Sequence, residues 1–193
     1  NLDHRRAILM DADPNAVGMQ QAFVEMASYL IDVGFSAPHI FAADLAQGFV
    51  LLEDFGDEVF ARMLVDAPAQ EAALYRSAAD CLAALHRQPA AKHLLQTTPD
   101  VLAKLIAPAF EWYAAKATPD NTQKAQTATV ALLATSLQRH APQCSVTVLR
   151  DFHAENLIWL PGRKGICRVG LLDFQDAVIG HPAYDPVSYT HLT

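Results

Sequence analysis

The sequence is poor in cysteine and has no long hydrophobic run, and each shortage excludes a class of protein. Its three cysteines are scattered and form no C-x-x-C pair, which argues against a disulfide framework, a thioredoxin-like redox site and a zinc ribbon. The longest stretch without a charged residue covers only residues 125–138 and includes Gln, Thr and Ser, whereas a membrane span needs about 20 apolar residues. We therefore expect a reduced, cytoplasmic protein that does not enter a membrane.

Basic residues are also scarce. The chain has 14 Lys and Arg against 21 Asp and Glu, a net charge of −7, which argues against a general nucleic-acid binder. No secretion signal opens the sequence, and its first residue is Asn1 rather than Met. We therefore expect a fragment or a processed chain. Apolar residues, by contrast, make up 52% of the 193 residues, enough to bury the core of one domain or slightly more.

Local patterns divide the chain into a strand-rich beginning, a helical middle and a second strand-rich part. Apolar spacing, alanine content and bounding prolines predict helices at 16–33, 68–87, 100–116 and 121–140. Short apolar runs predict strands at 4–10, 40–43, 49–52, 146–149, 157–160 and 169–172. The turn sequence at 161–165 joins the last two strands into a hairpin. This order predicts an α+β fold with a small lobe at 1–54, a larger lobe at 55–193 and a ligand cleft between them.

Two polar loops carry acidic groups directly beside apolar strands. Asp151 and Asn156 flank a short turn, and Asp173 follows the far strand of the hairpin. Carboxylates in such positions are costly to bury without partners, and the hairpin should bring the two loops together. Hard oxygen ligands of this kind suit a Mg²⁺ ion shared with nucleotide phosphates. The simpler alternative is that Asp151 caps a turn and Asp173 ends a strand.

These loops resemble the catalytic core of protein-kinase-like phosphotransferases. The strings Leu172–Ala177 and Gly180–Asp185 are similar to the aminoglycoside phosphotransferase family in particular. Leu51–Gly56 is similar to that family's strand and inter-lobe hinge, and Leu82–His86 to its helix ending in a Leu-His pair. The Asp-Phe-Gln-Asp-Ala form and the opening Leu-Met-Asp-Ala-Asp-Pro resemble a branch of bacterial kinases that phosphorylate the anomeric hydroxyl of N-acetylmuramate or N-acetylglucosamine.

The resemblance implies a two-lobe protein-kinase-like fold and an ATP-dependent transfer of the γ-phosphoryl group to a hydroxyl of a small molecule, an amino sugar of cell-wall recycling. It assigns Asp151 as the catalytic aspartate and Asn156 and Asp173 as Mg²⁺ ligands. Backbone groups at Glu53 and Asp54 would bind adenine. Glu25 lies on the first helix, where kinases place the glutamate that pairs with a strand lysine, and a solvated helix charge is the alternative interpretation. Neither the residues nor the resemblance identifies a protein partner.

Several features depart from the family pattern. Leu149 stands where the family commonly has His, and residues 6–11 contain no lysine, with Arg5 and Arg6 as poorly placed substitutes. No glycine-rich phosphate loop is present, and residues 188–193 do not have the pattern of a helix. We therefore expect a fragment that lacks both ends of its parent and is weak or inactive. A non-catalytic binding module is the main alternative, and an aminoglycoside or choline-type kinase is the second.

The sequence gives weaker support for two metal sites of other kinds. His153 and Glu155 have the H-x-E spacing of zinc deaminases, but no P-C-x-x-C follows. Together with His181 they match the ligand types of a two-His-one-carboxylate iron site, although the surrounding strands do not suggest a barrel. Under the kinase interpretation His153 lines the acceptor pocket or satisfies a loop carbonyl. The aromatic residues of the helix predicted at 100–116 are expected in the core, with contact to substrate as the alternative: Phe110, Trp112 and Tyr113.

Overall fold

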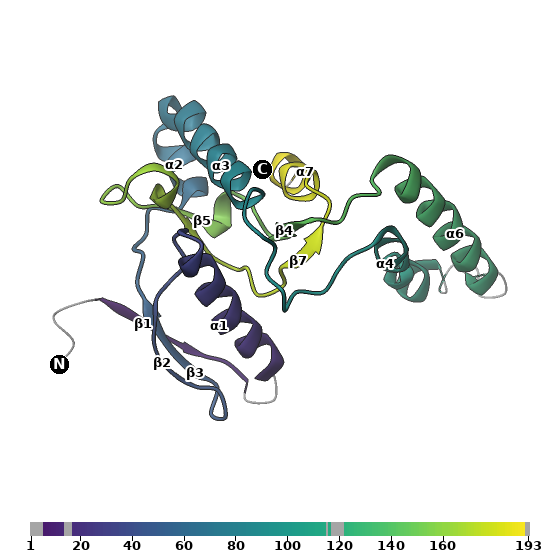
Figure 1. Cartoon of the computed structure of the whole chain (residues 1–193), viewed down its shortest axis with the longest axis horizontal. Helices are drawn as coiled ribbons and strands as arrows, with labels where there is room; N and C mark the ends of the chain where they lie inside the picture. The colour runs from purple at the N-terminus through teal and green to yellow at the C-terminus, as the bar shows by residue number, and fades with distance from the viewer. Residues whose placement is uncertain (1–5, 14–16, 115, 117–121, 192–193) are drawn as a thin grey trace.

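The structure is a computed structural model that describes residues 6–13, 17–114, 116 and 122–191. It is an α+β arrangement in which a small three-stranded sheet lies on one side of a set of helices and short strand pairs (Figure 1). The sheet is antiparallel with the order β1-β3-β2, formed by β1 (Ala7–Asp11), β2 (Ile40–Asp44) and β3 (Phe49–Glu53). Strands predicted at 40–43 and 49–52 are confirmed, and the predicted strand at 4–10 is confirmed from Ala7, since residues 4 and 5 lie outside the described residues.

Helix α1 (Val17–Asp32) packs one stripe of side chains into the core. Phe23, Met26, Ala27 and Leu30 are buried at helical spacing, as the sequence predicts. The helix ends at Gly34, which adopts φ 90° and lets the Phe35 amide donate to the Leu30 carbonyl at 2.8 Å. This left-handed residue is typical of a helix C-terminus.

The helical middle begins with α2 (Phe60–Asp66), the single 3₁₀ turn η2 (Pro68–Gln70) and α3 (Glu71–Leu85). Helix α2 is not predicted by the sequence. The next predicted helix, 100–116, is wrong as a single element. It is divided into α4 (Pro99–Lys104) and η3 (Ala109–Ala114), a short π-helix. Pro108 explains the break, because its ring clashes with the carbonyl group four residues earlier.

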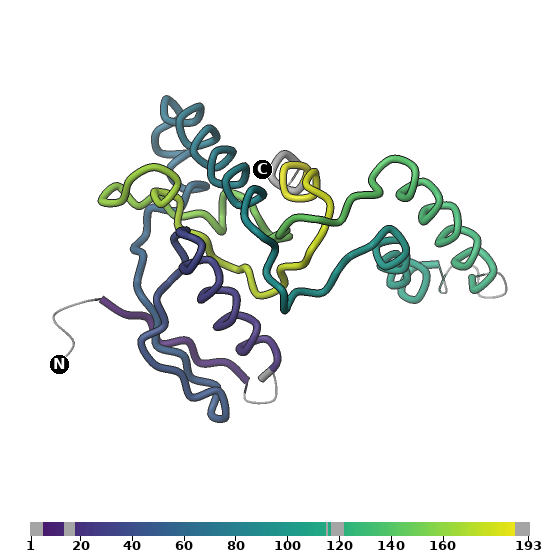
Figure 2. The backbone as a smooth tube through the Cα atoms, viewed as in Figure 1, coloured from purple at the N-terminus to yellow at the C-terminus, as the bar shows by residue number. Residues whose placement is uncertain are grey.

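Helix α6 (Thr122–His140) packs against α4, and residues 99–140 form what we call the arm. Figure 2 shows the backbone leaving α3, running out to the arm and returning from α6 toward the other helices. We call the remaining described residues the body. The outgoing segment is tied at the base of the arm to Ile179, which lies in a later strand: the Thr97 amide donates to the Ile179 carbonyl at 2.8 Å and the Ile179 amide to the Leu95 carbonyl at 2.9 Å.

The second strand-rich part contains two antiparallel pairs. Strand β4 (Val146–Val148) pairs with β7 (Val178–Gly180), which the sequence does not predict. The predicted hairpin is confirmed: β5 (Leu157–Trp159) pairs with β6 (Val169–Leu171), with the 3₁₀ turn η6 (Gly165–Arg168) in the connection.

A last helix, α7 (Tyr184–His191), contradicts the expectation that residues 188–193 are not helical, at least as far as residue 191. Residues 192 and 193 lie outside the described part. The helix was not predicted because residues 188–193 are mostly polar and show no apolar stripe. It begins upstream at Tyr184, with Asp185 and Pro186 in its first turn, where an acidic side chain and a proline are both favourable.

One buried cluster holds the body together. It contains side chains from both sides of residue 54, among them Met26, Val50, Leu74, Leu171 and Phe174. Cys81 lies in this cluster, and burial raises the pKa of its thiol to about 12, so it behaves as an apolar side chain. All three cysteines are free, as expected. Within the described ranges, no helix is long and apolar enough to cross a membrane.

Candidate active site

The loop after β4 is held in a rare backbone conformation just before Asp151. Arg150 has φ 72°, in the left-handed region that residues other than glycine seldom adopt. The carboxylate of Asp185, on α7, fixes this conformation by accepting hydrogen bonds from the Leu149 amide at 2.8 Å and the Arg150 amide at 2.9 Å. A strained residue that its surroundings hold so firmly is typical of functional sites.

Asp185 is completely buried, 35 residues away from the loop that it fixes. Burial raises the pKa of its carboxyl group to about 6; the two amide donors lower it and the nearby Asp151 charge raises it. The sequence gives Asp185 only as part of a resemblance and does not assign it this role. Asp185 contacts a loop that is distant in the sequence, so no local sequence pattern predicts that it fixes this loop.

Asn156 joins the two loops. It ends the single turn η5 (Ala154–Asn156), and its side-chain amide nitrogen lies 3.0 Å from the Asp151 carbonyl oxygen and 3.3 Å from Asp173 Oδ2. The same nitrogen lies 3.2 Å from Nε2 of His153. The structure therefore brings Asp151, Asn156 and Asp173 together, as the hairpin predicts. His153 contacts Asn156 in this loop.

Asp173 itself also has a left-handed backbone, with φ 55°. Its two carboxylate oxygens are both contacted by side-chain amides, Oδ1 by Gln175 and Oδ2 by Asn156. Arg150 and Asp173 are the only non-glycine residues with positive φ in the part of the chain that the structure describes, and both belong to these two loops. Backbone strain is thus concentrated at one place in the molecule.

The donor atoms here suit a hard cation. Asn156 contacts Asp151, His153 and Asp173 through its side-chain nitrogen, so its amide oxygen is engaged in none of these three contacts. Two oxygen donors without an all-protein cage fit Mg²⁺, which commonly takes its other ligands from water and phosphate. Across the described ranges, no three His, Cys, Asp or Glu side chains are grouped as a metal site would require. The described residues therefore assemble neither the zinc site nor the iron site considered from the sequence.

A model of the Phosphotransferase enzyme family, APH, matches residues 1–192 of the chain. The chain belongs to this family. Two solved structures share its fold: an aminoglycoside phosphotransferase from Streptomyces rimosus in complex with ADP and streptomycin, and a ternary complex of APH(2")-IIa with streptomycin and ATP. The first has a TM-score of 0.59 at 19% identity and covers 96% of this chain and 70% of that one. The second has a TM-score of 0.64 at 15% identity, with coverages of 93% and 62%.

Curated relatives are more similar in sequence. The N-acetylmuramate/N-acetylglucosamine kinase of Caulobacter vibrioides is 42% identical over 179 residues, which are 88% of this chain and 49% of that protein. The enzyme of the same name from Pseudomonas aeruginosa is 31% identical over 182 residues, 94% of this chain and 52% of that protein. The chain thus spans about half the length of the curated relatives it matches. The family and the protein-kinase-like fold predicted from the sequence are confirmed.

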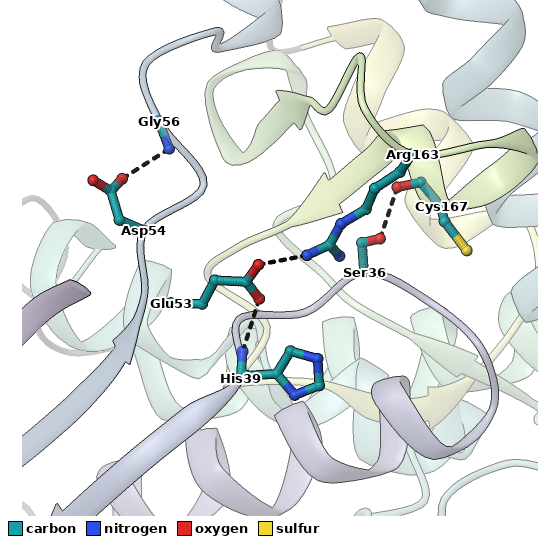
Figure 3. A network of polar contacts seen from close by, with 7 residues as sticks. All are labelled: Ser36, His39, Glu53, Asp54, Gly56, Arg163 and Cys167. Carbon is teal, nitrogen blue, oxygen red and sulfur yellow. Dashed lines mark hydrogen bonds and ion pairs between the residues drawn. The ribbon is translucent and has the colours of Figure 1, made fainter. Parts of the chain in front are cut away.

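The end of β3 and the segment after it are tied to the β5–β6 hairpin by side chains. Figure 3 shows Arg163 reaching from the hairpin loop to Glu53, with Nη2 2.6 Å from Oε1. The second oxygen of Glu53 accepts from the His39 amide at 3.3 Å. The Arg163 guanidinium also lies 4.9 Å from the centre of the Phe55 ring. The sequence suggests that side chains in this segment need not matter, but Glu53 links the small sheet to the hairpin.

Asp54 stabilises the turn that follows. Its Oδ1 accepts a hydrogen bond from the Gly56 amide at 2.8 Å (Figure 3), and Gly56 has φ 81°. Its Oδ2 lies 2.9 Å from Nε of Arg6, whose side chain is 74% exposed. Arg6 therefore pairs with Asp54, and Arg5 lies outside the described residues.

Helix α1 turns Gln20, and not Glu25, toward Asp173. Glu25 is exposed and accepts a hydrogen bond from Gln21 at 2.6 Å, a placement that agrees with the alternative of a solvated helix charge. Gln20 is buried and lines a cavity of about 330 Å³ together with Asp173. Helical periodicity predicts that Gln20 faces the core, because it lies three and seven residues before the buried Phe23 and Ala27.

The aromatic residues of η3 do not belong to the core, contrary to the prediction. Trp112 is 66% exposed and Tyr113 81%, whereas Phe110 is half-buried. Trp112 and Tyr113 line an open cavity of about 850 Å³ on the arm together with Lys116. The prediction fails because it assumed that these residues belong to one continuous helix packed against the core. The π-helix after Pro108 presents them to solvent.

Proposed function

We propose that the protein containing this chain transfers the γ-phosphoryl group of ATP to a hydroxyl of a small molecule, an amino sugar of the N-acetylmuramate or N-acetylglucosamine type. The observation that carries the proposal is the joining of Asp151 and Asp173 through one Asn156 amide, in a loop that Asp185 holds. Membership of the phosphotransferase family and the names of the curated relatives support the reaction and the acceptor class.

Asp151 acts as the base. It orients the acceptor hydroxyl and takes its proton while the hydroxyl oxygen forms a bond to the γ-phosphorus. The bond between that phosphorus and the bridging oxygen breaks, and ADP leaves with the electron pair. Fixing the preceding backbone turn through Asp185 keeps the carboxylate in position, which matters because positioning supplies much of the rate in phosphoryl transfer.

Asp173 and Asn156 hold Mg²⁺, which when bound neutralises charge on the phosphates. The strand-to-turn segment at Glu53 and Asp54 offers backbone groups to adenine, while its side chains tie the small sheet to the hairpin. In this scheme residues 1–54 form the nucleotide-binding lobe and residues 55–193 the catalytic and acceptor lobe. The reduced, cytoplasmic setting remains a prediction from the sequence.

A second candidate function is a binding module that holds nucleotide without transferring phosphate. One observation favours it: β1 carries no lysine, and Arg6 is engaged by Asp54. Retention of Asp151 beside the cation-binding pair favours the enzyme, since binding alone does not require a base.

The test is an assay of ADP release with ATP, Mg²⁺ and four acceptors side by side: N-acetylmuramate, N-acetylglucosamine, kanamycin and choline. The expected result is release that depends on an amino sugar. Release with kanamycin or choline alone would reassign the acceptor. Tight binding of Mg·ATP with no release for any of the four would favour the binding module.

A further inference from the structure

A buried side-chain oxygen on α1 has no hydrogen-bond partner among the residues that the structure describes. Gln20 is only 2% exposed, and its amide nitrogen donates to the Asp13 carbonyl at 3.0 Å, which fixes the orientation of the amide group. The other atom of that amide, Oε1, is buried and accepts no hydrogen bond from any residue that the structure describes. Buried polar atoms are nearly always paired, so an unpaired one calls for a physical explanation.

The cavity that Gln20 lines points to the missing partner. Its other walls are mainly apolar, with Met10, Met19 and Phe23, and its polar lining comes from Gln20, Asp173 and Gln175. The Gln175 amide nitrogen already donates to Asp173. The free Gln20 oxygen and the Asp173 carboxylate are both acceptors, so a molecule that fills this cavity well must bring a cation or hydrogen-bond donors.

The relation between Gln20 and Asp173 is rigid. One turn after Gln20, the Phe23 ring stacks on Phe174, with ring centroids 5.1 Å apart and planes within 8°. Phe174 is completely buried and follows Asp173 directly. Helix α1 is therefore packed directly on the Asp173 loop, and Gln20 lies one turn before this contact, at the cavity that it lines together with Asp173.

Phosphate oxygens at neutral pH accept hydrogen bonds and do not donate them, so the phosphates themselves cannot satisfy Gln20 Oε1. The donors in a Mg²⁺·nucleotide complex nearest its phosphates are the water molecules that Mg²⁺ characteristically retains. We propose that Gln20 Oε1 accepts a hydrogen bond from the hydration shell of the Mg²⁺·nucleotide held by Asp173 and Asn156. The inference rests on the proposed function and makes Gln20 a positioning residue that the sequence does not single out.

The test is the ADP affinity of the 193-residue chain, measured by calorimetry once with Mg²⁺ and once with EDTA. Gln20→Met keeps the size of the side chain and removes the acceptor. Gln21→Met is the matched control, because Gln21 is exposed on the same helix and its side chain donates to Glu25. We expect Gln20→Met to weaken Mg²⁺·ADP binding by about 10-fold and to leave metal-free ADP binding unchanged. Gln21→Met should change neither.

The outcomes separate this inference from the proposed function. If the wild-type chain does not bind Mg²⁺·ADP, the proposed function fails. If wild type binds and Gln20→Met binds equally well, only the role of Gln20 is overturned. An equal loss with and without metal would also overturn it, since the partner would then be a ribose or adenine group.

A measurement on the wild-type chain covers the case in which Gln20→Met does not fold. Mn²⁺·ADP should broaden the side-chain amide resonance of Gln20 and leave that of Gln138, on α6 in the arm, unchanged. A sharp Gln20 resonance in the presence of bound Mn²⁺·ADP would overturn the proposal.

Discussion

Helices α3 and α6 are similar in sequence, both long and rich in alanine, but they differ in how far the structure buries their side chains. Helix α3, in the body, buries six of its side chains, whereas α6, in the arm, buries none. In α3 the apolar residues Leu74, Ala78, Cys81 and Leu85 follow one stripe. In α6 one stripe, residues 126, 129, 130, 133, 134 and 137, is only half-buried, because α4 and η3, which pack against α6, are short.

The difference extends to the whole of both regions. Of the described arm residues, 99–114, 116 and 122–140, only Ala103 is buried. In the body, by contrast, a buried cluster surrounds the two strained loops and carries Phe174 directly after Asp173. Backbone conformations that are unfavourable in isolation persist only where surrounding packing fixes them. The body can therefore hold a precise polar site, and the arm offers an exposed aromatic surface.

The largest expected effect concerns chemistry in the body. Asp151→Asn should lower turnover of the amino-sugar substrate by about 10²- to 10⁴-fold, because the base is lost while the shape of the side chain is kept. Trp112→Ala, in the arm, should leave nucleotide affinity unchanged. ADP release and nucleotide calorimetry measure both effects, and near-normal turnover of Asp151→Asn would refute the assignment of the base.

The next prediction compares stability in the two regions with the same substitution. Leu74→Ala, at a position 2% exposed on α3, removes buried apolar contacts and leaves a cavity. It should lower the free energy of unfolding by about 2–5 kcal/mol. Leu132→Ala, at a position 74% exposed on α6, should change it by less than about 0.5 kcal/mol. Urea unfolding monitored by circular dichroism gives both values, and equal losses would show that the arm is packed like the body.

Asp185 should make the stability of the body depend on pH. Its pKa in the folded chain, about 6, lies above the ordinary value of 3.8, so the folded state binds more protons between these two values. Stability from this group is therefore fully present below about pH 4 and is lost as the pH rises through about 6, by at most roughly 3 kcal/mol.

The measurement is the difference in unfolding free energy between wild type and Asp185→Asn at several pH values, in which other carboxylates largely cancel. Wild type should lose stability relative to the variant from pH 4 to pH 7. A gap that moves the other way would show that the two amide donors, and not burial, dominate the pKa of Asp185.

The smallest effect is expected at the Glu53–Arg163 pair, because both side chains are partly exposed, 25% and 31%. Arg163→Met should cost less than about 1 kcal/mol, and the cost should shrink at high salt. Arg6→Met is the matched control, since the Arg6 side chain is 74% exposed and its pairing with Asp54 should contribute still less. Thermal unfolding at two salt concentrations distinguishes the two pairs, and a larger loss for Arg6→Met would contradict this ranking.

Much of the fold and the convergence at the site could be predicted from the sequence because the determining signals are local. The hairpin follows from a turn sequence between two apolar runs, and it places Asp173 beside the Asp151–Asn156 loop. The assignments of catalytic and metal-binding roles stay predictions. Strand β7 was not predicted because Val178 and Ile179 are followed directly by Gly180, His181 and Pro182, a sequence typical of a loop.

What the sequence could not supply are the contacts between distant segments. The bonds from the Asp185 carboxylate to two backbone amides join residues 35 and 36 positions apart, with no local pattern at either end. The burial of α3 and the exposure of α6 likewise depend on which helices lie nearby. Gln20 differs, because helical periodicity alone places it on the buried stripe of α1. Being uncharged, it carries no sign of a role in binding, unlike Glu25 on the same helix.

The most direct test of the central claim, that Asp151 and Asp173 serve one site with divided roles, is the Mg²⁺-dependent affinity for ATP of Asp151→Asn and Asp173→Asn measured side by side. The structure places Asp173 beside the Asn156 amide, and the proposal assigns this pair to the metal and Asp151 to the acceptor. Asp151→Asn should therefore bind Mg²⁺·ATP nearly as well as wild type, whereas Asp173→Asn should lose the gain in affinity that Mg²⁺ provides. Full Mg²⁺ dependence in Asp173→Asn would contradict the account.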